Sequence, residues 1–241
     1  MDWQEEGIVL RARRHGENAA VVTLLTEQHG RHAGLVRGAT GRRLRGVLQA
    51  GNRVDATWRA RLAEHLGTYA LEPVKGHAGP LMQHPDRLAA LTAICSLIDA
   101  GLPEREPHPA LFHATGALIE ALLLDDWPLA YVHWELGLLG ELGFGLDLSR
   151  CAATGRNDQL AYVSPKTGRA VSLSAGEPYK DKLLRLPPFL VGEGAQGAGE
   201  IVEALSLTGY FLERHVFAAL NQPLPDPRQR LAQLLKRDLE A

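Results

Sequence analysis

The fold of the first part of the chain is decided by the stretch Asn52-Arg53-Val54-Asp55-Ala56-Thr57-Trp58-Arg59-Ala60-Arg61-Leu62. Apolar and polar or charged residues alternate along it, a two-residue period that is typical of a strand with one buried face. Val54, Ala56, Trp58, Ala60 and Leu62 share one face, and three arginines lie on the other. We therefore expect a strand over residues 52–62. Its apolar neighbours favour a core position for Trp58, although an exposed indole could also serve as a stacking surface.

Four shorter stretches around this one also have strand character and are separated by turn residues. They lie at residues 8–13, 21–25, 33–37 and around Tyr69 and Leu71, with a glycine- and arginine-rich loop at 38–46. Five short strands in about 75 residues fit a small barrel better than an open sheet, which would leave its edges and one face uncovered. The sequence thus predicts an N-terminal β-barrel of the OB-fold type over residues 1–80.

From Pro85 onward, apolar residues recur at steps of three and four, which is the period of a helix. Residues 146–190 are instead rich in Gly, Ser, Thr, Asn and Pro and read as an irregular insertion. We predict an all-α domain over residues 81–241 that carries this insertion, and hence a two-domain α+β protein. The expected helices run from Pro85 to Gly101, Pro109 to Leu124, Pro128 to Gly143, Gly199 to Asn221 and from Asp226 onward, the last burying Leu231, Leu234, Leu235 and Leu239.

The composition is that of an ordinary globular protein, with 45% hydrophobic and 22% charged residues in a chain of 241. Two cysteines cannot form a disulfide framework. The acidic start, Met1 to Glu6, lacks the pattern of a signal peptide. The longest uncharged helical stretch, Leu88 to Ile98, is half the ~20 residues that span a bilayer. We expect a soluble, cytoplasmic protein with no membrane partner.

The net charge of −2 conceals a basic front and an acidic remainder. Residues 1–80 hold 12 Lys and Arg against 8 Asp and Glu, and residues 81–241 hold 14 against 20. Between Arg31 and Arg61 there are eight arginines and one acidic residue, Asp55. Arginine binds phosphate and stacks on bases, so this cluster indicates a nucleic-acid site, with a merely solvated face as the alternative. The candidate DNA-binding residues are Arg37, Arg42, Arg43, Arg45, Arg59 and Arg61.

Motifs for catalysis, a metal or a cofactor are weak throughout the sequence. There is no Gly-x-Ser-x-Gly elbow, and the ten histidines lack cysteine or carboxylate partners at metal-ligand spacing. Residues 192–197 match G-x-G-x-x-G, but a dinucleotide site needs a preceding strand, and Leu186-Pro187-Pro188-Phe189 stands there. We interpret this motif as a linker into the next helix. The chain is thus expected to be no enzyme and to take no small-molecule substrate.

Several short stretches, taken in order, carry a family resemblance over most of the chain. They are Glu6-Gly7-Ile8-Val9-Leu10, His15-Gly16-Glu17, Leu24-Leu25-Thr26-Glu27-Gln28-His29-Gly30, Leu35-Val36-Arg37-Gly38-Ala39 with the basic run to Arg45, Trp134-Glu135-Leu136, Leu142-Gly143-Phe144-Gly145-Leu146-Asp147-Leu148, Cys151 and Tyr162-Val163-Ser164-Pro165-Lys166-Thr167-Gly168. In these stretches the chain resembles the RecO family of bacterial recombination mediators.

The resemblance implies a non-enzymatic role in DNA repair. The OB-fold would bind single- and double-stranded DNA and anneal complementary strands. With the partner RecR, the protein would help to load RecA onto DNA coated by the single-strand-binding protein SSB. The helical domain would dock the acidic, apolar C-terminal tail of SSB, with the helix from Pro128 to Gly143 or the last helix as candidate linings. Such a protein would be cytoplasmic and associated with the nucleoid.

The irregular insertion departs from the pattern of some family members, which carry a four-cysteine zinc site there. Cys151 matches the first ligand, but Thr154 stands in the place of the second. Ser172, Ser174 and Ala175 occupy the neighbourhood of the other two. One thiolate cannot hold zinc tetrahedrally, so we predict that the insertion resembles a zinc ribbon without its ligands and folds without metal.

Two other classes of function are compatible with the residues alone. An OB-fold factor that binds or processes RNA would use the same basic barrel. A hydrolase or transferase with the irregular insertion as a lid is the enzyme alternative. Comparing RNA with DNA in one titration separates the first of these from a DNA-binding protein.

Overall fold

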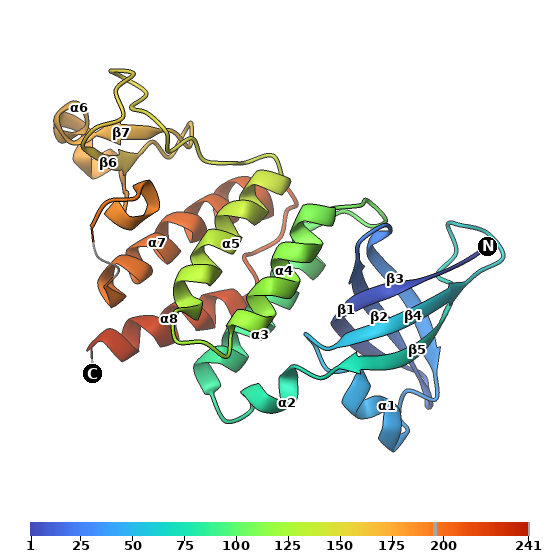
Figure 1. The fold of residues 1–241 in the computed structure, drawn as a ribbon. Coiled ribbons are helices and arrows are strands. Elements are labelled where there is room, and N and C mark those ends of the chain that lie inside the picture. Colours follow the sequence, from blue (N-terminus) through green and yellow to red (C-terminus); the bar gives the residue numbers. More distant parts are fainter. Residues whose placement is uncertain (195–196, 241) are drawn as a thin grey trace. The chain divides into compact units, whose positions relative to one another are not determined.

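The computed structural model describes residues 1–194 and 197–240. The chain divides into two compact units (Figure 1). The first comprises Met1–Asp125 and Pro225–Leu231, and the second comprises Asp126–Leu224 and the chain from Ala232 onward. The chain changes from strands to helices near residue 80. That this point is a domain boundary stays a prediction.

Five strands form the barrel of the first unit: β1 (Asp2–His15), β2 (Ala19–Thr26), β3 (Gly30–Arg37), β4 (Arg53–Arg59) and β5 (Thr68–Lys75). Their order is β1-β2-β3-β5-β4, and β4 pairs with β1 again, so the sheet closes on itself. All neighbours are antiparallel except β3 and β5, which run parallel. The parallel pairing spans only two residue pairs, Leu35 with Thr68 and Val36 with Tyr69. The predicted small barrel of the OB-fold type is confirmed (Figure 1).

The barrel core follows the alternation read from the sequence. Trp58 is 3% exposed, and its indole Nε1 donates a hydrogen bond to the carbonyl of Leu66 at 3.0 Å. Trp58 is therefore a core residue and not a stacking platform. The core is completed by Val9, Ala20, Val22, Leu24, Val36, Val54, Ala56, Tyr69 and Leu71.

Two local predictions about the barrel are wrong. The strand predicted over residues 52–62 ends at Arg59, so Leu62 is exposed and Arg61 lies in the connection to β5 instead of on the barrel wall. The predicted loop at 38–46 contains a short helix, α1 (Arg42–Val47). This helix forms because Leu44, Val47 and Leu48, spaced by three and four residues, pack against the barrel core.

Asn52 fixes the end of α1 to the next helix. Its side-chain nitrogen donates hydrogen bonds to the carbonyls of Gly46 and Val47 at 2.8 and 3.4 Å. Its side-chain oxygen accepts hydrogen bonds from the backbone N–H groups of His77 and Ala78 at 2.8 and 3.2 Å. One buried amide thus satisfies groups that both helix ends would otherwise leave unpaired.

Three helices follow the barrel within the first unit: α2 (Ala78–Leu81), α3 (Pro85–Gly101) and α4 (Pro109–Ala121). The bounds of α3 are those predicted, whereas α4 ends three residues early. Helix α3 packs against β1, where the Cys95 thiol donates to the carbonyl of Val9 at 3.7 Å. Gly51 adopts a φ of +85°, and a Cβ there would lie 2.4 Å from a methyl carbon of Leu91, so glycine is required.

The second unit is built on α5 (Trp127–Glu141) and α7 (Ala198–Phe211), which pack together. The Thr208 hydroxyl donates to the buried carboxylate of Glu135 at 2.5 Å. The helix predicted to reach Asn221 continues beyond α7 only as a π-helical turn, η3 (Leu212–Phe217). Helix α8 spans Asp226–Glu240, as predicted, with Leu231 buried and Leu234 and Leu235 half-buried. The side chain of Leu239 lies outside the described part of the chain.

The insertion at 146–190 contains a small sheet in the order β7-β6-β8. Its elements are β6 (Leu160–Val163), β7 (Ala170–Ser172), α6 (Leu173–Gly176), η1 (Glu177–Lys182), β8 (Leu184–Arg185) and η2 (Pro188–Val191). Between α5 and α7 the structure therefore has short strands instead of the predicted irregular chain, and the status of this segment as an insertion stays a prediction. These strands were not predicted because each has only two to four residues and lies in a stretch of polar composition.

Candidate nucleic-acid interface

A groove of about 720 Å³ opens on the barrel between β3, α1, β4 and β5. It exists because the parallel pairing of β3 and β5 stops after two residue pairs. Beyond that point the two strands have no ladder between them, and α1 covers one side of the opening. The lining residues are Val36, Arg37, Gly38, Gly41, Arg43, Leu44, Thr57, Arg59, Thr68, Tyr69, Ala70 and Leu71. We call this opening the barrel groove.

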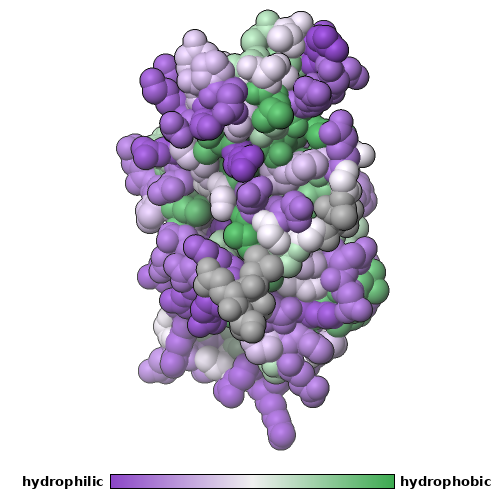
Figure 2. All heavy atoms as spheres, turned by 90° about the vertical axis from the view of Figure 1, so that its left-hand side faces the viewer, coloured by the Kyte–Doolittle hydropathy of each residue, from purple (hydrophilic) through white to green (hydrophobic). Residues whose placement is uncertain are grey.

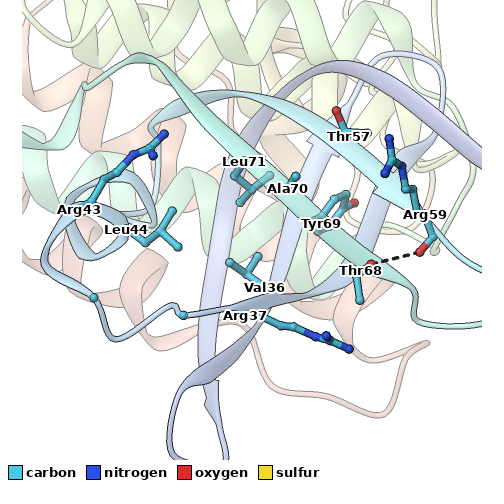
Figure 3. Close-up of a pocket in the computed structure, with 12 residues that line it drawn as sticks. Val36, Arg37, Arg43, Leu44, Thr57, Arg59, Thr68, Tyr69, Ala70 and Leu71 are labelled. Carbon is cyan, nitrogen blue, oxygen red and sulfur yellow. Dashed lines mark hydrogen bonds between the residues drawn. The ribbon is translucent and has the colours of Figure 1, made fainter.

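The barrel groove has an apolar floor and a basic rim. Val36, Leu44 and Leu71 supply the apolar surface. Figure 3 shows Arg43 and Arg59 at opposite ends of the opening and Arg37 along its side. Guanidinium groups in this arrangement suit phosphates on the rim, and the apolar floor suits the less polar parts of a nucleotide.

The rim charges have no carboxylate partner in the part of the chain that the structure describes. Among the described residues, none of Arg37, Arg43 and Arg59 has a carboxylate within 4.0 Å. Their side chains are exposed. Other arginines of the same sequence cluster are engaged, because Arg31 pairs with Glu104 at 3.4 Å and Arg53 with Glu6 at 2.8 Å.

The structure brings three of the six predicted arginines together and leaves the other three outside the groove. Arg42 and Arg45 are exposed on α1, where Arg45 donates to the carbonyl of Thr40 at 3.5 Å. Arg61 is exposed in the connection between β4 and β5. These three do not line the opening.

Sequence reasoning missed the hydroxyl groups of the groove, those of Thr57 and Thr68. Thr68 donates to the carbonyl of Arg59 at 3.5 Å (Figure 3). The alternation along β4 places Thr57 on the same face as Arg59, and that signal could have found it. Thr68 could not be found in this way, because its position depends on the pairing of β5 with both β3 and β4.

An aromatic cluster inside the barrel supports the floor of the groove. The ring nitrogen Nδ1 of His32 lies 2.8 Å from the hydroxyl oxygen of Tyr69. Burial lowers the pKa of His32 to about 4, with Arg105 and His29 adding to the effect, so this ring is neutral at pH 7. Burial also raises the pKa of Tyr69, which therefore keeps its proton. A Cβ on Gly34 would lie 2.5 Å from the Tyr69 ring, so glycine lets this ring lie against β3.

The surroundings of Cys151 do not fit a tetrahedral zinc ion. Thr154 and Ser172 stand near the thiol in place of further thiolates, and the backbone N–H of Ser172 donates to its sulfur at 3.2 Å. Burial works to raise the pKa of Cys151, but hydrogen bonds with Ser172 and Thr154 outweigh it and lower the pKa to about 6. Within residues 1–194 and 197–240, no group of three or more His, Cys, Asp and Glu residues is placed to hold a metal ion.

The G-x-G-x-x-G match at 192–197 falls partly outside the described residues, because Ala195 and Gln196 are not described. The element before it is the short 3-10 helix η2 and not a strand. The backbone N–H of Gly197 donates to the Glu200 carboxylate at 2.8 Å, which puts a negative charge where a pyrophosphate would lie. No helix in the described part of the chain is long and apolar enough to cross a membrane.

Comparison with known proteins matches both parts of the chain to the same family. The family described as "Recombination protein O N terminal" matches residues 1–76, and "Recombination protein O C terminal" matches residues 82–223. The "DNA repair protein RecO" of Rhodospirillum centenum is 61% identical over 232 residues, covering 95% of this chain and 93% of its own length. Its counterpart from a Ruegeria species is 52% identical over 239 residues, covering 98% and 99%. The one from Rhodospirillum rubrum is 49% identical over 245 residues, covering 98% and 97%. With both of its parts matched and with relatives of about half or more identical residues along nearly its whole length, the chain belongs to the RecO family of DNA repair proteins.

Proposed function

We propose that this protein binds single- and double-stranded DNA through the barrel groove, anneals complementary strands and helps, together with RecR, to load RecA onto SSB-coated DNA. The observation that carries the proposal is the set of three exposed guanidinium groups around an apolar floor, without carboxylate partners among the described residues. Membership of a family of DNA repair proteins supports DNA as the polyanion. The protein acts by binding and not by catalysis.

Electrostatics supplies the physical basis for annealing. Two DNA strands repel each other through their phosphates, and cations that neutralise part of this charge lower the barrier to pairing. Phosphate contacts carry no sequence information, so binding is tolerant of sequence and sensitive to salt. Arg37, Arg43 and Arg59 are the proposed contacts, and Arg42, Arg45 and Arg61 add charge outside the groove.

The helical domain, residues 81–241, is the proposed site of partner proteins, including the acidic tail of SSB, with α5 or α8 as the candidate lining. An acidic, apolar tail needs an apolar groove with a basic edge. In the view of Figure 2, apolar residues show in several separate areas between hydrophilic ones. Action on DNA implies a place in the cytoplasm at the nucleoid.

The insertion is proposed to fold without zinc. Its support is the donor set around Cys151, in which hydroxyl and backbone groups take the place of thiolates. Metal analysis of the purified protein tests this proposal, and one zinc ion per chain would contradict it.

The experiment that tests the main proposal mixes complementary oligonucleotides with the purified protein without ATP, at low and then at raised salt. We expect accelerated pairing at low salt that weakens as salt rises. A parallel titration compares single-stranded DNA with RNA of the same sequence. Tighter binding of RNA would favour an RNA-binding factor, and no binding of either strand would contradict the proposal.

A further inference from the structure

A second, smaller recess adjoins the barrel groove across Arg43. Its volume is about 270 Å³, and its lining includes three cations, Arg43, Arg53 and Lys75. Arg43 lines both openings. The rest of the lining is Gly46, Val47, Asn52, Pro73 and Gly76, from the end of α1, the start of β4 and the end of β5. We call this opening the second recess.

Two cations of the second recess differ from those of the barrel groove, because each already has a carboxylate partner. Arg53 pairs with Glu6 at 2.8 Å, and Lys75 pairs with Glu120 at 2.5 Å. Both carboxylates are partly exposed, with side chains 48% and 44% accessible. Exposed ion pairs are weak, so a phosphate that arrives with the rest of a strand can replace either carboxylate.

We propose that a DNA strand bound in the barrel groove continues past Arg43 into the second recess, where its phosphates replace Glu6 and Glu120 as the partners of Arg53 and Lys75. This inference rests on the proposed function. Arg43 is the link, since it lines both openings. Glu6 and Glu120 then compete with the phosphates for Arg53 and Lys75 and lower the affinity of the second recess for the strand.

Strand length separates the two openings. OB-folds bind about 4–16 nucleotides, so a strand of about 4 fills the barrel groove alone and one of about 12 reaches further. The second recess therefore contributes only to the longer strand. Removing a cation from the second recess should therefore weaken binding of the longer strand. Removing a competing carboxylate should strengthen that binding.

The experiment measures fluorescence anisotropy of labelled oligothymidylates of about 4 and about 12 nucleotides with the full chain. For Lys75→Ala we expect about fivefold weaker binding of the longer strand at low salt and a salt slope smaller by about 0.7, because one phosphate contact is lost. For Glu120→Gln we expect about threefold tighter binding of the longer strand. Neither variant changes the affinity for the shorter strand.

The matched controls are Lys180→Ala and Glu177→Gln, which break a similar exposed pair in the second unit, with Lys180 and Glu177 2.8 Å apart. They should change neither affinity. The inference is overturned if Lys75→Ala binds the longer strand as tightly as the wild type does, or if Glu120→Gln binds it more weakly. In either case the proposed function still holds, provided that the wild-type chain binds DNA. Failure of the wild-type chain to bind either strand overturns both. A Lys75-dependent affinity for an acidic peptide, without any effect of Lys75→Ala on DNA, assigns the recess to a protein and overturns the inference.

Discussion

The barrel groove and the surroundings of Cys151 are both clusters of polar groups, and they differ in where those groups find partners. The rim of the groove holds three guanidinium groups without carboxylates among the described residues. Cys151 is buried and engaged in hydrogen bonds with Ser172 and Thr154. Like charges around one opening repel one another, and an anionic ligand relieves the repulsion. A cluster whose polar groups form hydrogen bonds with one another stabilises the fold and needs no ligand.

The strongest test of this comparison reverses the charge of the groove rim. In the triple variant Arg37→Glu, Arg43→Glu and Arg59→Glu we expect at least about a hundredfold loss of affinity for single-stranded DNA, because three phosphate contacts are lost and three repulsive charges are gained. All three side chains are exposed, so the fold should survive. Anisotropy titration measures the affinity, and circular dichroism checks the fold.

The matched control reverses the other three predicted arginines, Arg42, Arg45 and Arg61, which are exposed but do not line the groove. The change in net charge is the same, so the two variants differ only in the position of the charges. We expect less than about a tenfold loss for this control, from long-range repulsion alone. Equal losses in the two variants would show that net charge, and not the groove, governs binding.

Much of this architecture could be predicted from local sequence patterns. The alternation from Val54 to Trp58 identified the barrel wall, and Pro85 and Pro109 mark the true starts of α3 and α4. Each of these signals lies within a few residues of the element that it describes. Proline fixes its own φ and lacks an N–H, so its effect on a helix start needs no tertiary contact.

The wrong predictions depend on contacts between residues far apart in the sequence. Alternation continues through Ala60, Arg61 and Leu62, yet the strand ends at Arg59. In the structure, Arg105 donates to the carbonyls of Ala63 and His65 and so holds this connection away from the ladder. Which arginines line the groove is equally non-local, because the opening follows from the short parallel pairing of β3 and β5.

A second test of the comparison uses salt. Three phosphate contacts on a single strand give a slope of about −2 in log affinity against log salt, since each contributes about −0.7. Between about 50 and 200 mM salt, the affinity of the wild-type protein for a short strand should then fall about twentyfold. Each single variant to alanine at Arg37, Arg43 or Arg59 should reduce the slope by about 0.7. A slope near zero in the wild type would mean that the rim makes no phosphate contacts.

The third test concerns the satisfied cluster at Cys151. Its pKa of about 6 lies below the ordinary value of 9.0, so the folded state favours the thiolate. The resulting stabilisation is complete above about pH 9 and is lost as the pH falls through about 6. The free energy of unfolding of the wild type, relative to Cys151→Ser, should therefore rise by about 1 kcal/mol between pH 6 and pH 7. Urea denaturation at the two pH values measures this, and a difference independent of pH would contradict it.

The smallest effect on DNA binding is expected from a change to the Tyr69 hydroxyl, which forms hydrogen bonds inside the barrel although Tyr69 lines the groove. Tyr69 lines the groove, but its hydroxyl is committed to His32 inside the barrel. Tyr69→Phe removes that hydrogen bond and leaves the apolar floor in place, so we expect about 1 kcal/mol less stability and less than about a twofold change in DNA affinity. Urea denaturation and anisotropy on the same sample give both values. If the stability stayed constant while the affinity fell severalfold, the hydroxyl would be contacting DNA. The distinction between groups that are satisfied inside the protein and groups that bind a ligand would then fail within the groove itself.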